Sequence, residues 1–109
     1  RERGVLIVGS GNIVHNLRTM RRDVPDNQAY DWAVDFDTHI AGLIHAGDAA
    51  GLADFRSQGR NAELSQPSWD HYLPLLYAAG AVDKGEDVRF FNADFQKASI
   101  SMRSMVWGI

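Results

Sequence analysis

The side chains best suited to metal binding or proton transfer in this chain are those of two histidines, His15 and His71. Neutral imidazole binds iron or zinc, and its pKa near 6.5 also suits it to proton transfer around neutral pH. Each histidine follows a turn, His15 in Gly-Ser-Gly-Asn-Ile-Val-His-Asn-Leu-Arg (9–18) and His71 in Pro-Ser-Trp-Asp-His-Tyr-Leu-Pro-Leu-Leu-Tyr (67–77). Either one alone would more often be structural, and so long a separation is not by itself a metal-binding signature. We predict that the two rings share one metal-centred active site.

The segment around His15 is predicted to form a strand, a turn and a helix. Val5-Leu6-Ile7-Val8 is a short, mostly β-branched apolar run, and it predicts a buried strand over residues 4–9. Gly9 and Gly11 should then form a turn with backbone angles that other residues avoid. Apolar residues return at helical spacing over 12–20. This order places His15 near the carboxyl end of a strand, where open α/β sheets build their sites.

A long amphipathic helix is predicted over residues 29–46. Apolar side chains recur there at helical spacing and define one buried stripe, which consists of Trp32, Phe36, Ile40, Leu43 and Ile44. Gly47 should end this helix, and Asp48 should cap a shorter helix that continues through Phe55.

The second half of the chain is predicted to hold a loop, a helix and two strands. Residues 57–66 are polar, which indicates a surface loop. A helix is expected over 69–79, where Pro74 should cause a kink unless it falls in the first turn. The β-rich runs 88–91 and 99–106 predict two strands. Helices and strands together favour an α/β fold.

Other motifs carry weaker signals. The glycine turn could present backbone N–H groups to a phosphate, but Val14 stands where a dinucleotide fingerprint has its third glycine. His39 and His45 lie on the long predicted helix, where a structural or helix-end role is ordinary. Asp31 and Asp35 share a face of that helix and should be solvated.

The composition is that of a small, slightly acidic globular domain. The 109 residues are 45% hydrophobic and 23% charged with a net charge of -3, which suggests neither nucleic acid nor a membrane surface as a partner. No apolar run approaches the roughly 20 residues of a membrane span. The chain has no cysteine, and Arg-Glu-Arg-Gly at its start is not a signal peptide, so we expect a cytoplasmic location. The chain also lacks an initiating Met and enters a predicted core strand almost at once, so we expect a segment of something longer.

The two histidine segments, 9–18 and 67–81, resemble those of the class III extradiol ring-cleavage dioxygenases, in particular the LigB-type group that includes the DOPA 4,5-dioxygenases. Trp32-Ala33 with Phe36-Asp37, and Ser-Ile-Ser-Met-Arg-Ser (99–104), resemble the same group. The resemblance follows the family's order over nearly the whole chain and covers only the carboxyl-terminal half of the family. Val-His-Asn-Leu-Arg and His-Tyr-Leu-Pro-Leu are its most specific pieces.

The resemblance implies a three-layer α/β sandwich, of which residues 1–109 would be a single, partial catalytic domain. It also implies a mononuclear non-haem iron(II) enzyme that opens a catechol ring with dioxygen, next to the two hydroxyls. His71 would be a metal ligand, and His15 either a further ligand or the acid/base that handles the catechol and oxygen protons. Asn16 and Tyr72 are candidates for contacts with the substrate. A histidine-rich site could also hold zinc in a crystal, although zinc cannot activate dioxygen by changing its redox state.

Members of this family are more than twice as long, and their amino-terminal half supplies further metal-binding histidines. One of these lies in a Gly-His-Gly-Ser-Pro segment, which this chain lacks. The metal site therefore needs the missing half or another chain to be complete. Two other functions stay open: a zinc-dependent hydrolase or phosphoesterase on a similar site, and a non-catalytic subunit or remnant that a fuller partner completes.

Overall fold

The structure is a computed structural model that describes residues 3–109. Its regular elements are short apart from one long helix. In chain order they are α1 (Asp31–Ala46), α2 (Ala49–Ala53), the 3-10 helix η1 (Phe55–Gln58), α3 (Arg60–Ser65), α4 (Leu73–Gly80), β1 (Val88–Phe91), β2 (Phe95–Gln96), β3 (Ile100–Ser101) and β4 (Ser104–Trp107).

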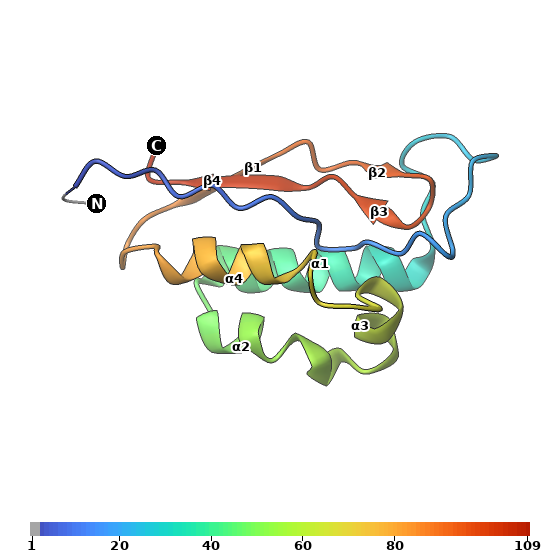
Figure 1. Cartoon of the computed structure of the whole chain (residues 1–109), viewed down its shortest axis with the longest axis horizontal. Coiled ribbons are helices and arrows are strands. Elements are labelled where there is room, and N and C mark those ends of the chain that lie inside the picture. Colours follow the sequence, from blue (N-terminus) through green and yellow to red (C-terminus); the bar gives the residue numbers. More distant parts are fainter. Residues whose placement is uncertain (1–2) are drawn as a thin grey trace.

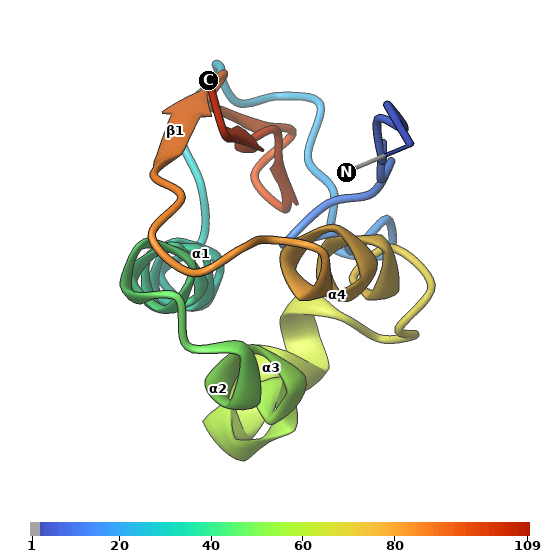
Figure 2. The ribbon, with the colours of Figure 1, turned by 90° about the vertical axis from the view of Figure 1, so that its left-hand side faces the viewer.

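These elements are stacked in layers (Figure 1). The strands and the amino-terminal segment lie above α1 and α4, and α2 and α3 lie below them. The end-on view shows α1 under the strands and α4 under the amino-terminal segment (Figure 2). Both strand pairs, β1 with β4 and β2 with β3, are antiparallel. The predicted combination of helices with sheet is thus present, and the complete three-layer sandwich stays a prediction.

Helix α1 forms where the apolar stripe predicted it. Phe36, Ile40 and Ile44 are buried on its inner face. Gly47 ends the helix in the left-handed conformation, with φ 70°, and its N–H donates to the carbonyls of the last turn. Asp48 caps α2 as predicted, because its side chain accepts a hydrogen bond of 2.8 Å from the Gly51 N–H. That helix ends at residue 53, two residues before its predicted end.

The predicted loop at 57–66 was wrong, because most of it is helical. It contains the end of η1 and all of α3, whose Ala62 and Ser65 are buried. A helix of this length buries few side chains, and the ones that α3 buries are small. Its sequence therefore lacks large apolar residues and resembles that of a polar loop. Helix α4 begins later than predicted, and Pro74 occupies its first turn, where proline causes no kink.

The amino-terminal segment differs from its prediction most. Residues 3–30 contain neither a helix nor a named strand. The strand predicted at 4–9 is wrong, since Leu6 and Val8 are 83% and 79% exposed. The helix predicted at 12–20 is also wrong, and His15 forms an isolated antiparallel bridge with Ile100 instead.

Tertiary hydrogen bonds explain why the segment around His15 is not helical. The Val14 carbonyl accepts a hydrogen bond of 3.0 Å from the Ser101 N–H, and the Asn16 N–H donates to the Ser99 carbonyl at 3.2 Å. Backbone groups paired in this way are unavailable for a helix. The adjacent Ile13 and Val14 are both buried, whereas Leu17 is exposed, so the apparent helical spacing was misleading.

Gly9 and Gly11 are needed for close packing, not for the unusual backbone angles that we predicted. Neither is among the glycines with positive φ. A Cβ atom on Gly9 would lie 2.8 Å from the Pro74 carbonyl oxygen, and one on Gly11 would overlap the His71 carbonyl oxygen. The two glycines therefore let the amino-terminal segment lie directly against the start of α4.

The carboxyl-terminal third is a β ribbon, as predicted, but it is interrupted. The predicted strand 88–91 coincides with β1. The predicted strand 99–106 is divided into β3 and β4, which pair with different strands and in different registers: Ser101 lies opposite Phe95 in one pair, and Ser104 lies opposite Phe91 in the other. No helix in the described part of the chain is long and apolar enough to span a membrane.

Candidate functional site

The structure brings His15 and His71 together. Their rings are stacked, with centroids 3.6 Å apart and planes 18° from parallel. Both residues are half-buried. Two imidazoles far apart in the sequence thus form one cluster, and their chemical roles remain a prediction.

His15 is positioned by backbone pairing on both sides of its segment. Its N–H donates to the Ser65 carbonyl at the end of α3, at 2.8 Å. On the other side the segment is bridged to Ile100 in β3. The Gln66 amide adds hydrogen bonds of 2.8 and 2.7 Å to the carbonyls of Asn12 and Ile13. The segment that carries His15 is therefore fixed between a helix end and a strand.

His71 lies in the turn that precedes α4. Its carbonyl accepts a hydrogen bond of 2.8 Å from the Asn12 N–H, which ties this turn to the segment that carries His15. The adjacent Gly11 permits this approach, as described above. The same two backbone stretches that bring the main chains together therefore also hold the two rings in contact.

The surroundings of His15 favour its neutral form. Partial burial lowers the pKa of the His15 imidazole, and the neighbouring His71 lowers it further, while a hydrogen bond to backbone raises it by a smaller amount. A neutral imidazole keeps one ring nitrogen free to accept a proton or to bind a metal ion.

The histidine pair fits a metal centre as part of its ligand set. Imidazole nitrogens are suitable ligands for iron(II) or zinc. Within residues 3–109 there is no group of three or more histidine, cysteine, aspartate or glutamate side chains that could hold a metal ion. The lone pairs lie in the ring planes, so two nearly parallel rings must rotate for both nitrogens to converge on one ion. His39 and His45 lie on exposed positions of α1.

Asn16 and Tyr72, which we predicted to contact substrate, have structural hydrogen bonds here. The Asn16 side chain donates to the Leu64 carbonyl at 2.7 Å and accepts from the Arg18 N–H at 3.0 Å. Tyr72 is fully buried, and its hydroxyl donates to the Leu52 carbonyl at 2.8 Å. Burial raises the pKa of the Tyr72 hydroxyl above its usual range, so it stays protonated.

An ion pair between Asp37 and Arg103 was not predicted. The Asp37 carboxylate on α1 accepts from the Ser101 hydroxyl at 2.6 Å and from Arg103 Nε at 3.0 Å. Asp37 is almost fully buried. The sequence held a signal, because position 37 falls on the same helix face as Ala33 and Ile40, and a carboxylate on a buried face requires a partner.

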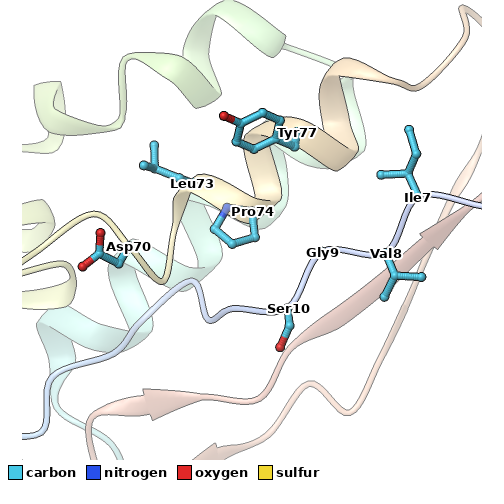
Figure 3. Close-up of a pocket in the computed structure, with 8 residues that line it drawn as sticks. All are labelled: Ile7, Val8, Gly9, Ser10, Asp70, Leu73, Pro74 and Tyr77. Carbon is cyan, nitrogen blue, oxygen red and sulfur yellow. The ribbon is translucent and has the colours of Figure 1, made fainter.

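Two grooves flank the amino-terminal segment. The larger, of about 580 Å³, lies among that segment, α4 and the β ribbon, and it is lined by His71 and Arg103 among mostly apolar residues. The smaller, of about 390 Å³, is lined by residues 7–10 and by residues at and just before the start of α4 (Figure 3). There Asp70 and Ser10 supply polar groups, and Pro74 and Tyr77 form part of the wall.

Comparisons with known proteins agree with the resemblance seen in the sequence. The chain is 36% identical over 111 residues to the 4,5-DOPA dioxygenase extradiol of Escherichia coli K12. The aligned region covers 99% of this chain and 40% of that protein. It is 34% identical over 85 residues to the protein of the same name from Mirabilis jalapa. That aligned region covers 76% of this chain and 30% of that protein. No family model matches the chain.

A solved structure shares the fold of this chain. The crystal structure of an uncharacterized protein from Escherichia coli K12 matches this fold with a TM-score of 0.78 and 28% identity. The match covers 97% of this chain and 44% of the other. The predicted resemblance to the extradiol dioxygenases is therefore confirmed, and the chain spans 30 to 40% of the length of the curated relatives that it matches.

Proposed function

We propose that this chain is the carboxyl-terminal part of an extradiol dioxygenase that opens a catechol ring at a mononuclear non-haem iron site. The contact between the His15 and His71 rings, at 3.6 Å, carries the proposal. Both histidines stand in segments that resemble the extradiol family, and the fold brings them together. Two relatives that bear the name of such an enzyme are 34 and 36% identical to the chain.

The two histidines would have different roles. His71 would hold the metal, since it is among the residues that line the larger groove. His15 would take a proton from a catechol hydroxyl, because its lowered pKa keeps the ring neutral and able to accept it. Iron(II), when bound, would supply the redox chemistry that dioxygen requires.

The remaining ligands would come from polypeptide outside these 109 residues. The described residues offer a pair of ligands rather than a set of three, and the relatives are more than twice as long. In this proposal the same additional polypeptide completes both the ligand set and a three-layer sandwich. A second chain could supply it as well as a preceding segment could.

Oxygen consumption tests the proposal. The chain, together with the polypeptide that completes it, should consume one dioxygen per catechol opened when loaded with iron(II). The zinc-loaded protein should bind catechol without consuming oxygen. Ester hydrolysis without oxygen uptake would instead favour the hydrolase, and failure of the complete, iron-loaded assembly to do either would favour the non-catalytic subunit.

Substitutions separate the two roles. His71→Ala should abolish metal retention in the complete assembly. His15→Gln should remove ring opening while the metal stays bound. His39→Gln, on an exposed face of α1, is the matched control and should leave both unchanged. Wild-type metal occupancy in His71→Ala, or near-normal turnover in His15→Gln, would contradict the assignment.

A further inference from the structure

Gln66 lies between the two segments that carry the histidines, and the proposed chemistry leaves it without a role. It is only 3% exposed, and it lines neither of the two grooves described above, so contact with a substrate there does not account for it. We propose that Gln66 is a positioning residue that holds the His15 ring against the His71 ring through the backbone. The inference rests on the proposed function, because it names a residue on which that reaction depends.

The orientation of the Gln66 amide is determined by its partners. Its Nε2 atom donates to the Asn12 carbonyl at 2.8 Å and to the Ile13 carbonyl at 2.7 Å. Both partners are acceptors, so only the nitrogen end of the amide can face them. One side chain at the end of α3 therefore fixes two consecutive carbonyl groups of the segment that leads to His15.

The turn formed by residues 66–71 bonds to Asn12 at both of its ends. At the start of the turn, the Gln66 amide donates to the Asn12 carbonyl. At its end, the His71 carbonyl accepts from the Asn12 N–H at 2.8 Å. Without the Gln66 amide, Asn12 would be bonded to this turn at one end only. The segment that carries His15 could then shift relative to the turn that carries His71.

The Gln66 side chain is not arranged for stability alone. Within the described part of the chain, its Oε1 atom is buried and has no hydrogen-bond partner. A buried acceptor that is left unpaired costs free energy, and this cost offsets part of what the two donated hydrogen bonds contribute. A side chain whose contribution to stability is reduced in this way fits a role in holding the histidine segments in position.

NMR of the metal-free protein, together with the polypeptide that completes it, tests the inference. Wild-type protein should show a nuclear Overhauser effect between the His15 and His71 rings, whose centroids lie 3.6 Å apart. Gln66→Met keeps an unbranched side chain of similar length but removes both donors, so the folded variant should lose most of this signal. Gln96→Met is the matched control, because Gln96 is exposed on β2, and it should keep the signal.

A second variant keeps the test decisive if Gln66→Met unfolds. Gln66→Asn retains the amide on a shorter side chain that cannot reach both carbonyls, so the signal between the rings should again weaken. Absence of the signal in wild-type protein, wild-type intensity in a folded Gln66 variant, or the same loss in Gln96→Met would overturn the inference. Unfolding of both Gln66 variants would also overturn it, because it would assign Gln66 to the fold and not to the histidine pair.

Kinetics of the iron-loaded complete assembly give a second readout. A small misplacement of reacting groups can lower a rate by about 100-fold, so Gln66→Met should lower kcat for catechol opening by up to that factor. KM should stay nearly unchanged, because Gln66 lines neither groove. A raised KM with wild-type kcat would contradict a positioning role. The NMR signal does not require ring opening, so failure of the proposed enzymatic activity would be seen separately.

Discussion

Two stretches of the amino-terminal segment, residues 5–8 and 13–16, both lie outside helices and both contain apolar residues, yet they have opposite environments. Val8 is 79% exposed, whereas Val14 is fully buried. The difference lies in the hydrogen-bond partners. The stretch around Val14 is paired with β3 on one side and with the end of α3 on the other. Apolar character alone therefore does not make an ordered strand, because the backbone must also be paired.

The same contrast between a paired, buried stretch and an unpaired, exposed one is found in the candidate site, which this chain completes only in part. His15 belongs to the buried stretch, so its position is set by residues of this chain. The exposed stretch lines the larger groove and leaves an apolar surface there. In our proposal, the additional polypeptide present in the longer relatives covers this surface.

A charge placed in each of the two stretches should give the largest difference in the stability of the fold. Val14→Asp should destabilise the fold by about 3 kcal/mol or more, because it buries an unpaired carboxylate. Val8→Asp should change stability by less than about 0.5 kcal/mol, as exposed substitutions usually do. Urea unfolding followed by circular dichroism measures both. Similar losses in the two variants would mean that residues 5–8 are buried in solution.

A smaller effect is expected where the segment lies against α4. Gly11→Ala should destabilise by roughly 1–3 kcal/mol, because its Cβ would overlap the His71 carbonyl. Gly42→Ala is the matched control, since nothing lies within 4 Å of a Cβ there, and it should stabilise α1 by up to about 1 kcal/mol. Thermal unfolding compares them. Equal melting temperatures for Gly11→Ala and wild type would show that the segment does not lie against His71.

The smallest effect should come from the protonation of His15. Its pKa is lowered in the folded chain, so as pH falls through the ordinary value near 6.5 the unfolded chain takes up the proton first. The stability of the metal-free chain should therefore decline modestly between about pH 7 and pH 5.5. Measuring the melting temperature across this range checks the sign. His15→Gln should flatten the profile, and an unchanged profile would mean that His15 titrates equally in both states.

The sequence predicted best those elements whose signals are local. The stripe that includes Phe36 and Ile40 defined α1, and Gly47 and Asp48 marked its end and the next start. Residues 4–9 and 12–20 were predicted wrongly, because their conformation depends on hydrogen-bond partners far away in the chain. Composition and spacing carry little information about such partners.

The residues of the candidate site also differ in how well the sequence predicts them. His15 and His71 could be singled out by residue type and by their place after turns, and the structure brings them together. Arg103 could not, since an arginine among β-rich residues reads as a solvated side chain. The structure shows instead that Arg103 pairs with the buried carboxylate of Asp37 on α1.

The shared metal-centred site is tested most directly by nitrogen NMR of the histidine rings during a zinc titration of the chain together with the polypeptide that completes it. His15 and His71 should shift together and saturate at one ion per chain, while His39 and His45, on exposed positions of α1, should not respond. Independent responses of His15 and His71, or the same response from all four rings, would contradict a shared site.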